Sequence, residues 1–302
     1  MPELPEVETI VKELRKKIIG LKITDIWTDW QKTVQQAGSI AGFKKQVKGK
    51  KILSIRRRAK YIIMDIEGAK TLFIHQKISG HLLYGKWIRR PADGKDVWIS
   101  QIPGPLKNDR QNGYIRLVLY LSNGYQLALS DLRRFGKVIL VDDDKIGDLK
   151  EISELGPEPL NMSSNQFKEL FRSSTSKHRK RGKLKQVLMD QTFIAGIGNI
   201  YSDEILWDSG YHPLSRVENL DSGDLKKIFD SSIRILKKAI KYRGSSTDDY
   251  RMPSGERGSF QDIRNAYQLT GEKCRKKDGG IIKRLKLGGR SAHFCSEHQK
   301  LK

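Results

Sequence analysis

The sequence predicts an α+β protein in which an N-terminal helix precedes an antiparallel β-sandwich or barrel, and a helical region follows. Two observations carry this prediction. Short apolar runs of strand length dominate up to about residue 145, and apolar residues recur at helical spacing after it. Turn signals separate the early runs, and none has a helical crossover beside it, which favours antiparallel pairing.

The first element is expected to be a helix over residues 6–19, because its apolar residues recur at helical spacing between Pro5 and Gly20. Residues 89–113, rich in Pro, Gly and charge, are expected to form a long exposed loop. The expected strands are 22–28, 51–57, 61–66, 71–75, 81–87, 114–121, 125–130 and 137–141. The expected later helices are 164–173, 184–190, 199–209 and 225–242.

The change of period places a domain boundary after residue 144. The expected parts are a sandwich domain over 1–144, a charged, Pro-containing linker over 145–160, a helical domain over 161–262 and a C-terminal segment over 263–302. We find no internal repeat.

Charge indicates the partner. Lys and Arg outnumber Asp and Glu by 58 to 35 in 302 residues, a net charge of +23 that predicts binding to a polyanion, DNA or RNA first. The longest apolar runs, such as 114–121, are too short to cross a membrane, and the acidic, Pro-broken start differs from a secretory signal. A cytoplasmic, nucleoid-associated monomer is expected. The two cysteines do not suggest a disulfide framework.

Pro2 is a candidate nucleophile. If Met1 is removed, Pro2 carries a secondary α-amine with a pKa of roughly 7.7 to 8.0, of which about a tenth is neutral at pH 7. Such an amine can add to C1′ of a deoxyribose, expel the base and leave an iminium that permits strand cleavage. Glu3 and Glu6 are nearby carboxylates that could move protons. Pro is also common at position 2 for unrelated reasons, so the position alone leaves this open.

The string Met1-Pro2-Glu3-Leu4-Pro5-Glu6-Val7-Glu8-Thr9 closely resembles the start of formamidopyrimidine-DNA glycosylases. The resemblance implies a bifunctional glycosylase and abasic-site lyase of base excision repair. Such an enzyme removes 8-oxoguanine and formamidopyrimidines from double-stranded DNA through a Schiff base on Pro2, with Glu3 as acid/base, and cuts by β/δ-elimination. One alternative is the sister endonuclease for oxidised pyrimidines, which usually has Gly where Leu4 stands. Another is a noncatalytic binder of damaged DNA.

Further segments continue the resemblance and imply DNA contacts. Lys60, in Arg58-Ala59-Lys60-Tyr61, corresponds to a lysine that binds the phosphate beside the lesion. Ile78 stands where the family normally has Met, and with Arg133 and Phe135 it would fill the space left by the extruded base. Leu132 replaces the family's usual Pro in the same turn.

Residues 186–206 are similar to the family's helix-two-turn-helix element, where Asn199 at a helix N-terminus would contact a phosphate. Residues 243–261 resemble the mobile loop that closes over the extruded base. Near the C-terminus, residues 286–294 look like the family's β-hairpin turn, in which Arg290 would grip the phosphates flanking the lesion.

The family's hairpin is held by a zinc finger of four cysteines, and this chain departs from that pattern. Cys274 and Cys295 are present, but Lys277 stands at the expected second ligand and His298 at the fourth. A one-residue insertion would make Cys274, Asp278, Cys295 and His298 the set, and these S, N and O donors suit one structural zinc ion. The alternative is a zinc-free hairpin held by apolar packing of residues 281–294.

Overall fold

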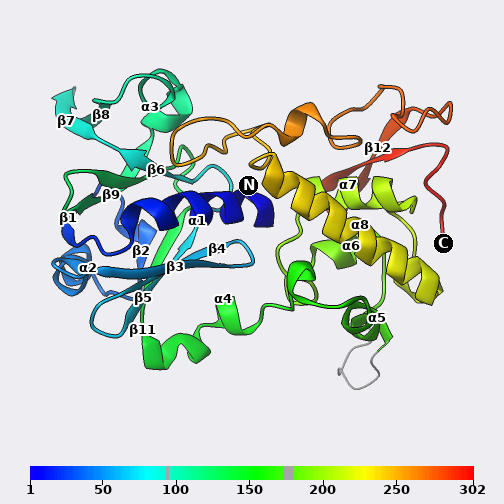
Figure 1. The fold of residues 1–302 in the computed structure, drawn as a ribbon, viewed down its shortest axis with the longest axis horizontal. Coiled ribbons are helices and arrows are strands. Elements are labelled where there is room, and N and C mark those ends of the chain that lie inside the picture. Colours follow the sequence, from blue (N-terminus) through cyan, green and yellow to red (C-terminus); the bar gives the residue numbers. More distant parts are fainter. Residues whose placement is uncertain (93–94, 173–179) are drawn as a thin grey trace. The chain divides into compact units, whose positions relative to one another are not determined.

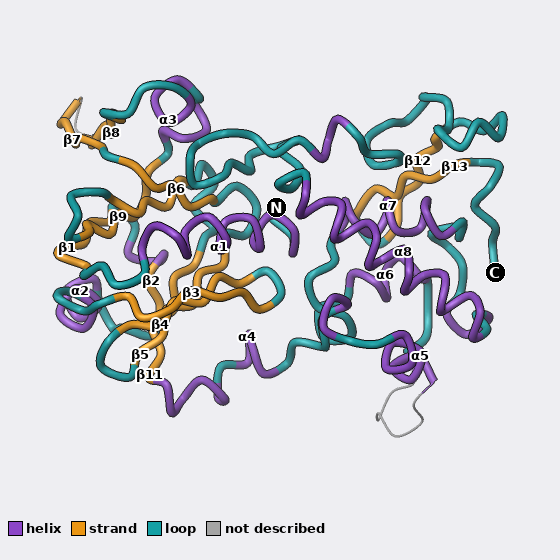
Figure 2. The backbone as a smooth tube through the Cα atoms, in the orientation of Figure 1, coloured by secondary structure: helices purple, strands orange, loops and turns teal. Residues whose placement is uncertain are grey.

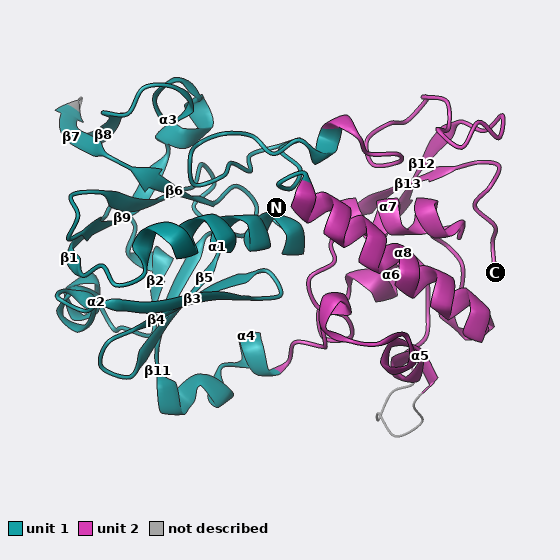
Figure 3. Ribbon diagram, viewed as in Figure 1, with its two compact units in different colours: residues 1–153, 242–261 teal, residues 154–241, 262–302 magenta. Residues whose placement is uncertain are grey.

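The computed structural model describes residues 1–92, 95–172 and 180–302, and they form two compact units (Figure 3). Unit 1 comprises Met1–Ser153 and Tyr242–Gln261, and unit 2 comprises Glu154–Lys241 and Asp262–Lys302. The prediction assigned residues 243–261 to the second domain. The structure corrects this, because the segment packs on unit 1, where Tyr250 and Met252 enter the main hydrophobic core.

Unit 1 opens with helix α1 (Leu4–Ile18), which packs on strands β3 and β4 (Figure 1). Its start has a capping box, in which Glu3 and Glu6 each accept a hydrogen bond from the other's backbone N–H. One apolar stripe of the helix, including Val7, Ile10 and Leu14, is fully buried in the core between the sheets.

Two sheets make up most of unit 1. One has the strand order β1-β9-β10-β6 and the other β2-β11-β5-β4-β3, and only the pair of β2 with β11 is parallel. The predicted antiparallel sandwich is confirmed. The strands are β1 (Ile23–Thr28), β2 (Val34–Gln35), β3 (Ile52–Arg58), β4 (Tyr61–Ile66), β5 (Lys70–His75), β6 (His81–Gly85), β9 (Ile115–Leu121), β10 (Gln126–Ser130) and β11 (Lys137–Asp142).

Residues 89–113 were expected to form a long exposed loop. For the residues of this range that the structure describes, 89–92 and 95–113, this prediction is wrong. Strands β7 (Trp87–Ala92) and β8 (Lys95–Ser100) form a hairpin, followed by α3 (Pro105–Asn108) and a 3-10 turn, η2 (Arg110–Gly113). Trp87, Trp98 and Leu106 are buried against the outer face of the first sheet. A few large apolar side chains therefore order a segment whose composition is that of a loop.

Shorter elements complete unit 1. Helix α2 (Ile40–Val47) was not predicted; Ser39 caps it by accepting from the N–H of Gly42, and Phe43 and Val47 anchor it in the core. The expected linker over 145–160 is not a simple extended segment, because it contains short helical turns. The remaining short elements are η1 (Gln31–Thr33), η3 (Asp143–Asp148) and α4 (Lys150–Ser153).

Unit 2 is helical with a C-terminal hairpin, as predicted (Figure 2). Helix α7 packs on α8 and on β13, and nearly all of α7 is buried. The end expected for the first helix, residue 173, lies outside the described residues. The elements are η4 (Pro159–Asn161), α5 (Ser164–Arg172), α6 (Leu184–Met189), α7 (Asn199–Ser209), η5 (Val217–Asn219), α8 (Ser222–Lys241), β12 (Ile282–Leu287) and β13 (Arg290–Cys295), with η6 (Phe260–Asp262) at the junction of the units.

No helix within residues 1–92, 95–172 and 180–302 has the length and apolar character needed to cross a membrane.

Candidate active site and metal centre

The N-terminus is held by the start of α1 and by the returning loop 242–261. Pro2 lies directly before Glu3, the residue that caps α1, and both are buried. Glu6 accepts from the N–H of Glu3 at 2.7 Å and from the N–H of Ser245 at 2.8 Å, so one carboxylate joins the helix to the loop. Gly244 has a φ of +77°, and a Cβ there would stand 2.7 Å from the Glu6 carboxylate. Glu6 therefore fixes the backbone around the candidate nucleophile.

A cavity of about 420 Å³ opens beside this terminus in unit 1. Its volume is within the range of roughly 300–1,000 Å³ that small-molecule sites have. Its walls combine the chain terminus, two side chains expected to replace an extruded base, and four polar residues that sequence reasoning missed. The lining residues are Met1, Ile78, Gln111, Arg133, Thr247, Asp248 and Asp249. Gln111 was missed because its segment was expected to be only an exposed loop, whereas Thr247, Asp248 and Asp249 lie in the segment predicted to close over the extruded base but were not singled out within it.

One buried carboxylate organises the turn that carries Arg133. Asp131 accepts from the N–H of Arg133 at 3.2 Å and from the N–H of Gly136 at 2.7 Å, and from the hydroxyl of Ser79. The same hydroxyl oxygen accepts from the N–H of Arg133 at 3.0 Å. Because Ser79 follows Ile78, the two turns that carry the predicted gap-filling residues are bonded to each other.

Two of the side chains predicted to fill the gap, Ile78 and Phe135, are exposed. Ile78 is 37% exposed and Phe135 is 49% exposed, so both can reach a partner. The guanidinium of Arg133 lies 5.1 Å from the centre of the Phe135 ring, a cation–π contact that pairs the two. Arg134, between them, has a φ of +57°, so the turn is tight.

Lys60 lies in the turn between β3 and β4 and is 5% exposed. It belongs to a cationic group with Lys77 and Lys137 around His75. Burial, then these three ammonium groups, lower the pKa of His75 to about 3. Its Nδ1 accepts a hydrogen bond from the N–H of Lys77 at 2.9 Å, and only an unprotonated Nδ1 can accept it. This end of unit 1 therefore gathers three ammonium groups, with one carboxylate, that of Glu151, 3.9 Å from the ammonium of Lys137.

A second cavity, of about 350 Å³, lies in unit 2 and brings together the two predicted phosphate-binding residues there, Asn199 and Arg290. Asn199 is the first residue of α7, and the free N–H groups of a helix start attract anions. Its buried amide oxygen has no partner among the described residues. The full lining is Asn199, Tyr267, Gln268, Arg284, Gly289, Arg290, Ser291 and His293. Lys60 belongs to unit 1 and does not line this cavity.

A buried ion pair holds the hairpin that carries Arg290. The ammonium of Lys185 lies 2.5 Å from a carboxylate oxygen of Asp203 and donates to the carbonyl of Ser291 at 2.9 Å. The other oxygen of Asp203 accepts from the N–H of His293 at 3.0 Å and lies 2.9 Å from Nδ1 of its ring. Lys185 and Asp203 are 1% and 0% exposed. Helices α6 and α7 are thus tied to β13 next to Arg290.

The four predicted metal ligands meet in unit 2. One ligand atom from each of Cys274, Asp278, Cys295 and His298 lies within 4.8 Å of the others, so the group could hold a metal ion. Nε2 of His298 lies 2.9 Å from the carbonyl oxygen of Trp207, which accepts a hydrogen bond from it. Nδ1 faces the cluster, 2.7 Å from a carboxylate oxygen of Asp278 and 3.5 Å from the sulfur of Cys274. A carbonyl that fixes the imidazole tautomer is typical of metal-binding histidines.

Known proteins are similar to this chain over most of its length. A family model described as the N-terminal domain of formamidopyrimidine-DNA glycosylase matches residues 1–138, and one described as the H2TH domain of that enzyme matches residues 155–251. The formamidopyrimidine-DNA glycosylase of Pelotomaculum thermopropionicum is 34% identical over 305 residues, covering 100% of both chains. That of Lactococcus lactis subsp. cremoris is 35% identical over 301 residues, covering 98% of both.

Solved structures of the Lactococcus lactis enzyme, Fpg, are similar over nearly the whole chain. A complex with DNA containing an abasic site has a TM-score of 0.81 and 33% identity, covering 99% of each chain. A complex with DNA containing Fapy-dG has a TM-score of 0.81 and 33% identity, covering 99% of this chain and 100% of the other.

Proposed function

Because the chain belongs to the formamidopyrimidine-DNA glycosylase family, we propose that it removes oxidised purines from double-stranded DNA with the amine of Pro2 and then cleaves the abasic site. The observation that carries the roles of individual residues is the cavity of unit 1, where the chain terminus meets Ile78 and Arg133. The DNA in the Lactococcus lactis complexes, with an abasic site or Fapy-dG, is the substrate class that we assign to this chain.

The proposed chemistry needs Met1 to be removed, so that the nitrogen of Pro2 becomes a secondary amine. This amine attacks C1′, a C–N bond forms, and the bond from C1′ to the base breaks as the base leaves with a proton. The sugar ring opens when Glu3 protonates its oxygen, which leaves an iminium on Pro2. Loss of a proton from C2′ then expels the 3′-phosphate, and a second elimination expels the 5′-phosphate. Glu6, bonded to two backbone N–H groups, positions Pro2 and Glu3.

The remaining predicted residues hold the DNA. Asn199 and Arg290 share one cavity, and we propose that it takes a backbone phosphate, while Lys60 contributes a further phosphate contact from unit 1. Ile78, Arg133 and Phe135 take the place of the extruded nucleotide. The protein's large positive charge adds affinity that does not depend on sequence and weakens with salt.

Borohydride trapping tests the nucleophile, because reduction of the iminium leaves a covalent protein–DNA adduct. We expect an adduct with DNA containing 8-oxoguanine opposite C or an abasic site. A variant that retains Met1 should give none, since its nitrogen at Pro2 is an amide. The P2G variant keeps a primary amine and should retain part of the lyase activity. A wild-type protein that binds such DNA without an adduct would instead be a noncatalytic binder.

Substrate choice is tested separately with two duplexes, 8-oxoguanine opposite C and thymine glycol opposite A. We expect faster excision of 8-oxoguanine. A strong preference for thymine glycol would assign the chain to the sister activity on oxidised pyrimidines.

We also propose that the cluster of Cys274, Asp278, Cys295 and His298 binds one structural zinc ion. Two sulfur donors, one imidazole nitrogen and one carboxylate oxygen suit tetrahedral Zn²⁺. When bound, the ion would stabilise the hairpin that carries Arg290 and take no part in the bond-breaking steps. We expect about one zinc per chain by elemental analysis, loss of zinc in C274S, and full retention in E297Q, which alters an exposed neighbour of Cys295. Wild-type protein refolded with zinc that retains none would contradict the site.

For its place in the cell, we propose the cytoplasm, in contact with the chromosome, because the substrate is DNA. A fluorescent fusion that spreads with the nucleoid would support this. A monomer is proposed as the acting species, and size-exclusion chromatography with light scattering tests it.

A further inference from the structure

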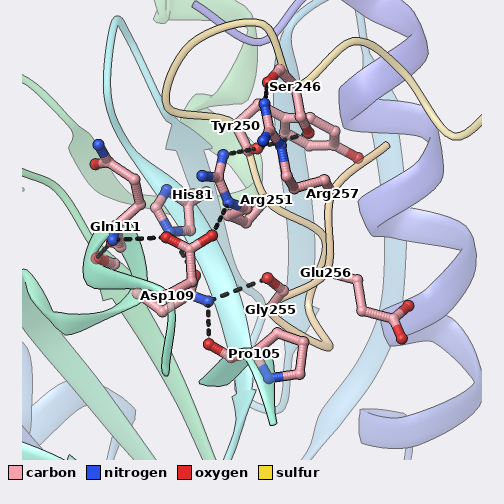
Figure 4. Close-up of polar contacts among 12 residues, drawn as sticks. His81, Pro105, Asp109, Gln111, Ser246, Tyr250, Arg251, Gly255, Glu256 and Arg257 are labelled. Carbon is pink, nitrogen blue, oxygen red and sulfur yellow. Dashed lines mark hydrogen bonds and ion pairs between the residues drawn. The ribbon is translucent and has the colours of Figure 1, made fainter. Parts of the chain in front are cut away.

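The loop 242–261 is fastened to the segment that contains α3 and η2 by an ion pair and an amide (Figure 4). The guanidinium of Arg251 donates to the carboxylate of Asp109 at 2.6 Å. The side-chain amide of Asn112 donates to the carbonyls of Pro105 at 2.9 Å and Gly255 at 3.1 Å. The Arg251–Asp109 and Asn112–Gly255 contacts lie within unit 1 and join residues that are 142 and 143 positions apart in sequence.

The ion pair reaches both polar walls of the cavity beside the N-terminus. Arg251 donates to the carbonyls of Asp248 at 3.1 Å and Tyr250 at 2.8 Å, so it fixes the backbone of the wall formed by residues 247–249. Asp109 accepts from the N–H of Gln111 at 3.0 Å and so fixes the backbone of this second lining segment. Figure 4 shows Asp109 between Arg251 and Gln111. One pair therefore sets the distance between two lining segments.

The pair is charged and largely shielded from water. The side chain of Arg251 is 7% exposed and that of Asp109 is 25% exposed. Burial alone would raise the pKa of Asp109, but hydrogen bonds from Arg251 and the N–H of Gln111 hold it below its ordinary value. Replacing either partner leaves a shielded charge without its counterpart, so the two side chains depend on each other.

The lining residues of these two segments include side chains that can accept hydrogen bonds. Asp248 and Asp249 have carboxylates, which accept, and Gln111 has an amide, which both accepts and donates. Oxidised purines of the 8-oxoguanine and formamidopyrimidine type carry several N–H donors on the base, whereas an abasic site has no base to bind. A site whose acceptors are correctly placed discriminates strongly for a substrate that supplies the donors.

We infer that the Arg251–Asp109 ion pair is a positioning pair, which holds the two acceptor walls at the spacing that an extruded oxidised purine requires and plays no part in cleavage at an abasic site. This inference rests on the proposed function. It predicts variants that separate the two activities of one enzyme.

The experiment compares R251Q and D109N with wild type on two duplexes, one with 8-oxoguanine opposite C and one with a preformed abasic site. Each variant should lose at least tenfold in kcat/KM for base excision, while abasic-site cleavage and borohydride trapping on abasic DNA stay within about threefold. The double variant should lose no more than the worse single variant, because both changes break one interaction. R251K, which keeps the charge but not the forked geometry, should recover part of the excision.

The matched control is E256Q, which breaks an exposed ion pair of the same loop with Arg243 and should excise as wild type does. Excision by R251Q at the wild-type rate would overturn the positioning role. Equal losses of excision and abasic-site cleavage, together with a lowered melting temperature, would also overturn it, since the pair would then merely support the fold. A wild-type protein that forms no adduct with abasic DNA would refute the proposed function itself, a result distinct from the other two.

Discussion

Replacing Lys185 by Met should destabilise unit 2 severely. The side chains of Lys185 and Asp203 are almost wholly buried, and the ammonium group is the cation closest to this carboxylate, at 2.5 Å. Met fills a similar volume, so the cost does not come from a cavity. It comes from the buried carboxylate of Asp203, which loses the ammonium group and keeps only its contacts with His293. Removing one partner of a buried ion pair costs about 3–5 kcal/mol. In a protein of this size, each kcal/mol lost from the free energy of unfolding lowers the melting temperature by roughly 2–4 °C. The melting temperature should therefore fall by on the order of 10 °C.

Urea unfolding followed by circular dichroism, with calorimetry, measures this loss. Two further proteins make the result specific. K226M breaks an exposed pair with Asp230 on α8 and should change the free energy of unfolding by at most about 0.5 kcal/mol. K185M/D203N removes the uncompensated charge and should recover most of the stability. If K185M were as stable as K226M, or if the double variant were no better than K185M alone, the buried charge would not be the cause.

Other perturbations have defined outcomes. Burial lowers the pKa of His75 to about 3 and that of His81 to about 4. As the pH falls below ~6.5, these histidines are therefore protonated in the unfolded chain but not yet in the folded protein. Each histidine should remove about 2 kcal/mol of stability by pH 5. Urea unfolding from pH 8 to pH 5 checks this, and H81Q should show a shallower decline; an identical decline would contradict it. D131N weakens the bonds that join the turns of Ile78 and Arg133, and should slow excision of 8-oxoguanine tenfold or more by single-turnover kinetics. Unchanged excision by D131N would show that the turns hold without the carboxylate.

Strong local periodicity explains which elements the sequence could predict. Strand β4 and helix α7 have the predicted bounds, and α1 begins two residues before the expected start. Helix α2 was missed because two turns give too few apolar repeats, and its stability comes from the cap at Ser39 and two buried side chains. The β7–β8 hairpin was missed because Trp87 and Trp98 order a polar segment through contacts with strands distant in sequence.

In the candidate site too, residues in local sequence strings could be predicted, whereas contacts between distant segments could not. Pro2, Lys60 and Arg290 could be named because each lies in a local string that resembles the family. The metal cluster could be named because the four-cysteine pattern of the family that the chain resembles, with a one-residue insertion, falls on Cys274, Asp278, Cys295 and His298. The pairing of Arg251 with Asp109 could not be predicted, because it joins two loops through tertiary contacts that no local pattern encodes. Acceptors such as Asp248 resemble ordinary surface residues until the fold places them at a cavity.

The division of unit 1 into two stretches of sequence has a consequence for synthesis. The candidate nucleophile leaves the ribosome first, but the wall formed by residues 247–249 and the bond from Ser245 to Glu6 belong to a segment made after most of unit 2. At about 5–20 residues per second, this segment emerges on the order of 10–50 s after Pro2. During translation the cavity beside the candidate nucleophile therefore lacks the wall of residues 247–249 until the chain is nearly complete, and we expect base excision only after that point.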